Sequence, residues 1–89
     1  MDIFALTTQE ILDKISRHCP EAMSTYLHCL NRADTNDKVS FDRYQIDVDM
    51  SEEWHVFRRN IKKLARENLL IWSPTTDGLE IHLVRNEDD

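Results

Sequence analysis

Residues 51–68, with the sequence SEEWHVFRRNIKKLAREN, carry the clearest structural pattern in this chain. Their apolar side chains recur at spacings of three and four residues, as on one face of an α-helix: Trp54, Phe57, Ile61, Leu64 and Ala65. Ser51 is a favourable N-cap, and Glu52 and Glu53 complement the positive end of the helix dipole. Asn68 tolerates the left-handed backbone conformation that often follows a helix end. The sequence therefore predicts one helix from Ser51 to about Asn68, with its apolar face in the core.

The face of this helix opposite the apolar residues is basic. At about 100° per residue, five side chains fall opposite the apolar arc or beside that position: His55, Arg59, Lys62, Lys63 and Arg66. Arg58 falls nearer the boundary of the core. A helix that is buried on one face and basic on the other suits the DNA major groove, where Arg can pair with guanine and Lys with phosphate. Because basic residues also solvate many exposed helices, a solvated or protein-facing helix is the alternative interpretation.

The charge of the chain is unevenly distributed. The net charge of −6 disfavours nucleic acid, since phosphate contacts supply most nonspecific affinity. Residues 52–68, however, hold five basic and three acidic side chains, a charge of +2, whereas the remaining residues hold six basic and 14 acidic ones, a charge of −8. The local field matters more than the sum when a polyanion docks, so the basic helix remains a candidate DNA-binding surface.

Two helices are expected before this one. Thr7-Thr8-Gln9-Glu10 is a capping box, and Leu6 with Ile11 forms a hydrophobic staple around it. A first helix then runs from about Thr8 to Cys19, with its apolar side chains at helical spacing: Ile11, Leu12, Ile15 and Cys19.

Pro20 ends this helix and suits the first turn of a second one. The apolar stripe of the second helix consists of Met23, Tyr26, Leu27, Leu30 and Ala33. We expect Phe57, Ile61 and Leu64 to be buried against four residues of these two helices: Ile11, Ile15, Leu27 and Leu30.

Residues 38–50 allow two interpretations. In one, Val39 and Phe41 belong to a short strand, and Ser40 caps a short helix that contains Phe41, Tyr44 and Ile46. In the other, the whole stretch is extended, because Tyr44, Ile46 and Val48 alternate with polar residues. The position just before a strong helix favours the first.

A β-hairpin is expected at the carboxyl end. Two β-rich runs, residues 70–73 and 79–84, flank a loop of Pro, Thr, Asp and Gly at Pro74–Gly78. The acidic residues 85–89 are expected to form a frayed tail, as are residues 1–6 at the other end.

Size and composition exclude several classes of protein. A chain of 89 residues has room for one domain, and 40% hydrophobic with 31% charged residues fits a soluble globular protein, which we expect to be cytoplasmic. No apolar run approaches the roughly 20 residues that span a membrane.

His18-Cys19 and His28-Cys29 lack the spacing of a zinc site, so we expect two free thiols and neither metal nor cofactor. Because no nucleophile–base set is visible, no enzymatic activity is expected. Trp54 and Trp72 fit packing positions better than a stacking platform for single strands.

The stretch from Val39 to Trp72, VSFDRYQIDVDMSEEWHVFRRNIKKLARENLLIW, resembles winged helix-turn-helix domains. In that superfamily a strand leads to a positioning helix, a turn ending in Ser, a recognition helix and a hairpin called the wing. The resemblance implies an α+β fold, mainly helical with a C-terminal β-hairpin wing, over residues 1–89. It also implies a protein that binds double-stranded DNA in transcription or replication control. Its DNA-binding residues would be Ser51, His55, Arg59, Lys62, Lys63 and Arg66, with Ser51 or its amide on a phosphate.

Two further expectations concern partners. So few basic groups favour a homodimer on two DNA half-sites, with the first helix or the N-terminal segment as its interface. The alternative function is a winged-helix interaction module or inhibitor that presents its acidic surface to a protein. The wing loop, which contains neither Lys nor Arg, favours this alternative.

Overall fold

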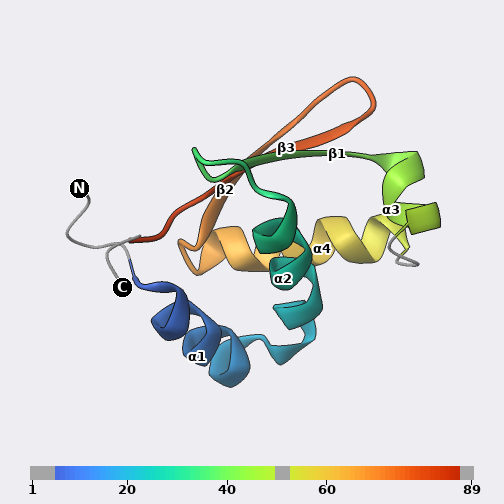
Figure 1. The fold of residues 1–89 in the computed structure, drawn as a ribbon. Coiled ribbons are helices and arrows are strands. Elements are labelled where there is room, and N and C mark those ends of the chain that lie inside the picture. Colours follow the sequence, from blue (N-terminus) through green and yellow to red (C-terminus); the bar gives the residue numbers. More distant parts are fainter. Residues whose placement is uncertain (1–5, 50–52, 87–89) are drawn as a thin grey trace.

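The computed structural model describes residues 6–49 and 53–86. Helices at the start of the chain are followed by a strand, two more helices and a C-terminal pair of strands (Figure 1). In order they are α1 (Thr8–His18), the 3₁₀ helix η1 (Pro20–Ala22), α2 (Met23–Arg32), β1 (Lys38–Asp42), α3 (Arg43–Asp49), α4 (Trp54–Arg66), β2 (Leu70–Pro74) and β3 (Gly78–Leu83). The chain is therefore a small α+β domain.

The three strands form one antiparallel sheet in the order β1-β3-β2. β2 and β3 make the expected hairpin, and β1 joins it from an earlier part of the chain on the other side of β3. The side chains of Val39, Ile81 and Trp72 lie in one row across the sheet, and those of Lys38, His82 and Ile71 lie in the next row. Because alternate residues face opposite sides, the first row faces the helices and the second faces solvent.

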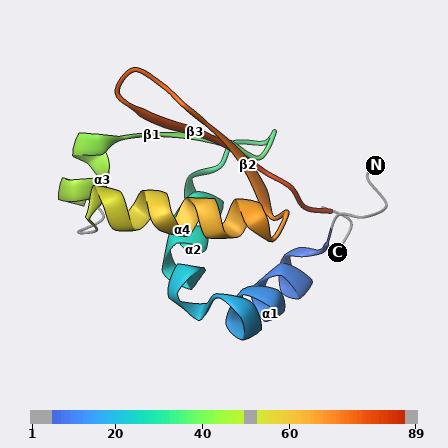
Figure 2. The same ribbon diagram turned by 180° about the vertical axis from the view of Figure 1, so that it is seen from behind.

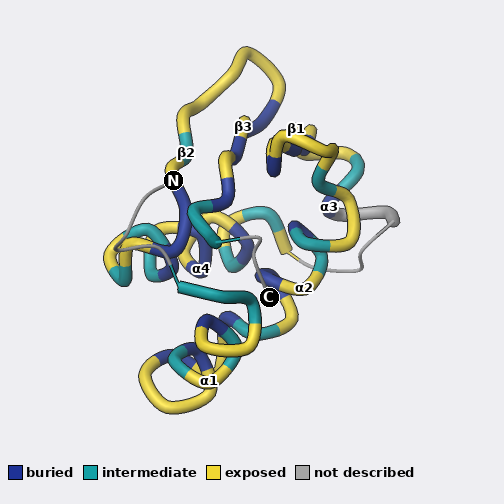
Figure 3. The backbone as a smooth tube through the Cα atoms, turned by 60° about the vertical axis from the view of Figure 1, so that its left-hand side comes forward, coloured by how far each residue is buried: buried dark blue, intermediate teal, exposed yellow. Residues whose placement is uncertain are grey.

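The helices cover the inner face of the sheet. α4 runs beneath it beside α2, and α1 lies further from the sheet (Figures 1 and 2). In the view of Figure 2, α4 lies at the front of the molecule and α2 lies behind it. One long side of α4 is therefore not covered by another helix or strand. In Figure 3 the sheet, the pair α4 and α2, and α1, which form the three layers of the fold, each contain buried segments.

The core joins all three layers. Phe57, Ile61 and Leu64 of α4 have no exposed surface, nor do Ile11 and Ile15 of α1, which confirms the expected core positions. The ring of Phe57 also packs edge-on against Phe41 of β1, with ring centroids 5.1 Å apart. The half-buried Trp54 stacks on Phe57, and Trp72 also packs against this core, as expected for both tryptophans.

The expectation for Leu27 is wrong. Leu30 packs against the core, but the Leu27 side chain is 41% exposed. α2 instead turns Thr25, Tyr26 and Cys29 inward. Thr25 accepts a hydrogen bond from the buried Asn60 of α4, which fixes the rotation of α2 and leaves Leu27 toward solvent.

The start of α1 agrees with the sequence. The Thr7 hydroxyl accepts a hydrogen bond from the Glu10 amide at 3.3 Å, and the Glu10 carboxylate accepts one from the Thr7 amide at 3.0 Å. These two bonds form the predicted capping box. The bond from the Thr7 amide is the main reason why the pKa of Glu10 lies below its usual value, because it stabilises the carboxylate.

Thr7→Ala is expected to lower the free energy of unfolding by about 1 kcal/mol, because the Glu10 amide loses its acceptor. The measurement is urea unfolding followed by circular dichroism. Ser16→Ala is the matched control, since Ser16 is exposed within α1 and alanine favours a helix interior. Equal losses in the two variants would contradict a role of the cap.

Residues 38–49 combine the two interpretations of the sequence. Residues 38–42 are extended and pair with β3, whereas residues 43–49 are helical. Phe41 therefore lies on the strand and not in the helix, and the expected cap at Ser40 is wrong. Asp42 caps α3 instead, since its carboxylate accepts a hydrogen bond from the Gln45 amide at 2.6 Å. Pairing with β3 satisfies the backbone of β1, and local sequence does not reveal that partner.

The long helix is shorter than expected. α4 begins at Trp54, and its N-cap is Glu53, which has extended backbone angles. Ser51 lies outside the described residues, three positions before the first helical residue, so its expected place as the N-cap is wrong. At the other end the helix stops at Arg66, and Asn68 adopts the left-handed conformation predicted for it, with φ 61°.

The chain stays anchored beyond β3. The Arg85 guanidinium donates two hydrogen bonds to Asp37, at 2.8 and 3.1 Å, and one to the Thr8 hydroxyl at 2.9 Å. The Asn86 amide donates to the carbonyl of Leu6 at 2.8 Å. The anchored part of the chain thus includes the first two residues of the expected frayed tail, because the tail returns to the start of α1.

Candidate nucleic-acid interface

The uncovered side of α4 is uniformly basic. Among its 13 residues, Trp54–Arg66, the exposed ones are His55, Arg58, Arg59, Lys62 and Arg66. The sequence of the helix contains no Asp or Glu. Every exposed position of α4 therefore carries a cationic side chain or a histidine.

Packing on the other side of the helix produces this arrangement. Phe57, Asn60, Ile61 and Leu64 are the buried residues of α4, and the helix packs against α2, η1, α3 and β2. Asn60 Nδ2 donates to the hydroxyl of Thr25 at 3.2 Å and to the carbonyl of Glu21 at 3.4 Å. These bonds hold the rotation of α4 about its axis, so the basic side chains keep a fixed direction toward solvent.

Arg58 is a member of this surface that sequence reasoning missed. The helical projection places it near the boundary of the core, but its side chain is exposed. The buried residues of α4 include Asn60, which shifts the centre of the buried face away from Arg58. The available signal was the spacing of Asn60, which lies three residues after Phe57 and four before Leu64 and so shares their side of the helix.

Lys63 is less exposed than the sequence predicts. Its ammonium lies 2.6 Å from a carboxylate oxygen of Glu21, and its side chain is only 33% exposed. This hydrogen bond is the main reason why the pKa of Glu21 is lowered. The expectation that Lys63 lies opposite the core is wrong: it points sideways toward η1, because Glu21 draws the ammonium there. It is therefore less available to an anion than its exposed neighbours.

The remaining expected residues lie on the exposed face. Arg59 and Arg66 share the outward direction of the helix, and the ammonium of Lys62 lies 5.9 Å from the ring centre of Trp72. His55 is exposed at the amino end, where its Nε2 lies 3.0 Å from a carboxylate oxygen of Glu53. Ser51, the sixth expected residue, lies outside the described part of the chain.

Both ends of α4 are held by other elements. At the carboxyl end, Lys14 donates to the Glu67 carbonyl at 3.0 Å, and His18 Nδ1 lies 2.7 Å from a carboxylate oxygen of Glu67. At the other end α4 packs against α3. The basic surface thus lies on an element whose position is set by its neighbours.

The hairpin loop between β2 and β3 is not basic. Residues 75–77 are exposed and include Asp77, as the sequence indicated. The Asp77 carbonyl accepts a hydrogen bond from the amide of Arg43 at 3.0 Å, which ties the loop to the start of α3. A hollow of about 600 Å³ in this region is lined by Asp42, Arg43, Tyr44, Thr76 and Asp77. Its two carboxylates outnumber its one guanidinium, so it does not extend the basic surface.

The cysteines do not contribute to a site. Cys19 and Cys29 are both buried and neither is in a disulfide, and burial raises the pKa of the Cys19 thiol. No cluster of three or more metal-ligating side chains occurs in residues 6–49 and 53–86. None of the helices in the described ranges is long and apolar enough to span a membrane.

Comparison of the chain with protein-family models, with curated proteins and with solved structures found no match.

Proposed function

We propose that this protein is a winged-helix DNA-binding protein that acts in transcription or replication control, with α4 as its recognition helix. One observation carries the proposal: all exposed residues of α4 are Arg, Lys or His, on a helix without a carboxylate in its sequence. In a chain of net charge −6 this concentration of cations is an exception to the overall composition.

The order of the elements supports the proposal. A strand, a short helix, a long helix and a hairpin follow one another as β1, α3, α4 and β2–β3, which is the order expected from the resemblance to winged helix-turn-helix domains. In such domains the second helix of the helix pair enters the major groove, where its side chains meet base edges and phosphates. α4 occupies that place in the order.

The exposed side chains divide into roles by position. Arg59 and Arg66 project away from the core, so they would reach farthest into a groove, where an Arg can contact the O6 and N7 atoms of guanine. Arg58 and Lys62 flank them and would meet phosphates on the side of β2. Lys63 would contribute less, because Glu21 already binds its ammonium. A phosphate contact of Ser51 remains part of the proposal.

The test compares two double variants that remove the same charge. Arg59→Ala with Arg66→Ala is expected to weaken binding to duplex DNA strongly, measured by fluorescence anisotropy across a salt series. If both residues contact phosphate, the slope of log affinity against log salt falls by about 0.9 for each. A base-reading Arg would instead cost about 1–3 kcal/mol on a preferred sequence and little on random duplex.

Arg17→Ala with Arg32→Ala is the matched control, because these exposed arginines lie on α1 and α2. It is expected to change binding far less. Both double variants should keep nearly the parent melting temperature, since an exposed charge contributes less than about 1 kcal/mol to stability. Equal DNA affinity of the two variants, or no binding by the parent at about 50 mM salt, would contradict the proposal.

That negative result would favour the alternative function, an interaction module or inhibitor whose acidic surface docks on a basic protein. The observation behind the alternative is the exposed hairpin loop, which carries Asp77 and no basic residue.

A further inference from the structure

The edge of the sheet formed by β2 is open. In the strand order β1-β3-β2, β2 pairs with β3 on one side only, and within residues 6–49 and 53–86 no strand pairs with its other side. An unpaired edge presents backbone donors and acceptors that can bind another strand.

The hydrogen bonds of the hairpin define which groups are available. The Val84 amide donates to the carbonyl of Leu69, its direct partner in the register, and the Thr75 amide donates to the carbonyl of Gly78, also its direct partner. Because hydrogen-bonded and non-bonded pairs alternate along an antiparallel ladder, Ile71 and Ser73 also bond to β3. The backbone groups of Leu70 and Trp72 therefore point outward from the open edge.

This edge lacks the charged side chains that usually protect an edge strand from pairing. β2 consists of LIWSP, and among the elements that the structure describes it alone has no ionisable side chain. Only the terminal Pro74 interrupts its donors. By contrast, the other edge strand, β1, carries the exposed charged residues Lys38 and Asp42 at its two ends. Charges on an edge strand oppose association, so β1 is protected and β2 is not.

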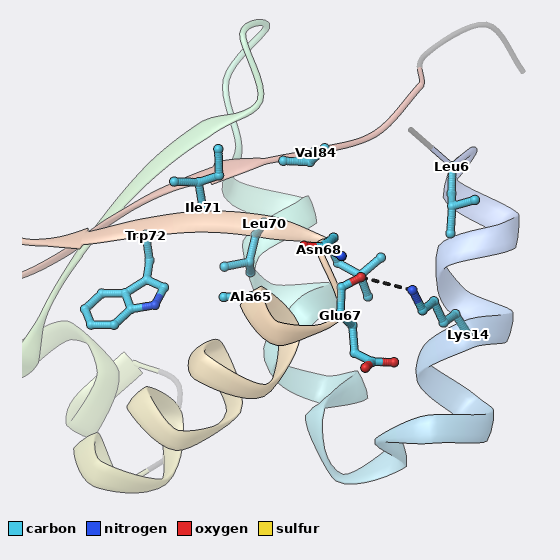
Figure 4. Close-up of a pocket in the computed structure, with 10 residues that line it drawn as sticks. Leu6, Lys14, Ala65, Glu67, Asn68, Leu70, Ile71, Trp72 and Val84 are labelled. Atoms are coloured by element: carbon cyan, nitrogen blue, oxygen red, sulfur yellow. Dashed lines mark hydrogen bonds between the residues drawn. The ribbon is translucent and has the colours of Figure 1, made fainter. Parts of the chain in front are cut away.

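Apolar surface accompanies the open edge. The Ile71 side chain is 62% exposed, and a groove of about 680 Å³ runs beside β2. Figure 4 shows Leu70 and Trp72 projecting from one side of the strand and Ile71 from the other. Leu6, Ala65 and Val84 add apolar surface to the groove, which Lys14 and Glu67 border at its far end.

We propose that a second copy of this chain pairs with β2 in antiparallel orientation, around a two-fold axis at Ile71. The open edge is self-complementary about that point: the outward groups of Leu70 would bond those of Trp72 in the second copy, and the reverse. The two Ile71 side chains would meet on the solvent face, and each Trp72 would pack beside Leu70 of the other copy. The two sheets would become one sheet of six strands.

The charge of the protein opposes a like copy least at this edge. Two molecules of net charge −6 repel one another, and an uncharged strand is the surface where that repulsion is least. Of the two interfaces expected from sequence, the first helix and the N-terminal segment, the first helix is less suited than β2. The exposed residues of α1 are all polar or charged: Gln9, Glu10, Asp13, Ser16, Arg17 and His18.

A single strand pair is a small interface. Stable complexes bury about 1,200–2,000 Å² in total, so this dimer should be reversible, with a dissociation constant between roughly 1 μM and 1 mM. The proposal does not rest on DNA binding, because β2 and the exposed face of α4 carry different side chains.

The first test is sedimentation equilibrium of the full chain over that concentration range. The parent is expected to shift from monomer to dimer. Ile71→Glu places two like charges opposite each other at the axis and should weaken the dimer at least tenfold. Leu27→Glu is the matched control: its site on α2 is also apolar and exposed, it adds the same charge, and it should leave dimerisation unchanged. A parent that stays monomeric overturns the proposal and leaves the edge to an extended peptide of another protein.

The second test fixes the register. In the proposed dimer residue 71 forms a non-bonded pair with its own copy, with Cα atoms about 4.5 Å apart, which suits a disulfide. Ile71→Cys should therefore form a covalent dimer with oxidised glutathione, while the buried Cys19 and Cys29 stay reduced. Tyr44→Cys, at a site 74% exposed on α3, is the control. Equal cross-linking of both variants, or an Ile71→Glu variant that dimerises like the parent, overturns the proposal.

Discussion

Leu64→Ala is expected to lower the free energy of unfolding by about 2–5 kcal/mol, a large part of the roughly 5–15 kcal/mol of a small domain. Leu64 has no exposed surface and belongs to the core that joins α4 to the other layers. Truncation removes buried methyl groups and leaves a cavity that the packed helices close only in part. The measurement is guanidinium unfolding, with the midpoint and slope fitted together.

Leu27→Ala makes the same chemical change at an exposed site and is the matched control. The Leu27 side chain is 41% exposed, so its truncation removes much less buried surface and should cost well under half as much. Sequence periodicity assigns both leucines to the core, whereas the structure assigns only Leu64. Similar losses in the two variants would show that α2 packs as the sequence predicted.

Gly78→Ala is expected to destabilise the protein by about 3 kcal/mol or more, at the upper end of overpacking effects. A Cβ atom at Gly78 would overlap the carbonyl oxygen of Phe41 and lie 2.7 Å from the Cα atom of Asp42. Both are backbone atoms of β1, so no side-chain rotation relieves the clash. The end of β1 would have to move away from β3, and the start of α3 with it, because Asp42 caps that helix. Thermal unfolding followed by circular dichroism measures the loss.

Thr76→Ala is the control for this variant. Thr76 is exposed in the same loop, so its truncation should shift the melting temperature little. The glycine is required here by close approach and not by backbone angles, since its φ is not positive. A Gly78→Ala variant as stable as the parent would mean that β1 does not pass so close to β3.

The candidate site was partly predictable. Helical spacing correctly turned His55, Arg59, Lys62 and Arg66 to solvent, because their places follow from the apolar arc alone. Arg58 and Lys63 were predicted incorrectly: Arg58 is exposed and not at the boundary of the core, and Lys63 pairs with Glu21. Glu21, 42 residues away in the sequence, draws Lys63 aside, and no local pattern reveals that contact.

The open edge of β2 was also only partly predictable from the sequence. The sequence predicted the hairpin, but it did not predict that β1 would pair with β3 and leave β2 at the edge. The backbone groups that we propose to pair in a dimer are therefore identified only by the order of the strands.

The sequence by itself determined the features that a few neighbouring residues decide. These are the capping box at Thr7, the left-handed Asn68, the hairpin turn and the apolar face of the long helix, each set by local hydrogen bonds, backbone preference or periodicity. The tertiary structure alone decided where residues 38–49 change from strand to helix and which face of α2 is buried. It also decided which cations of α4 remain available. Each of these depends on a partner distant in sequence: β3 for β1, Asn60 for Thr25, and Glu21 for Lys63. Such contacts form only when the chain has folded, because their energy comes from surfaces that the linear sequence does not bring together.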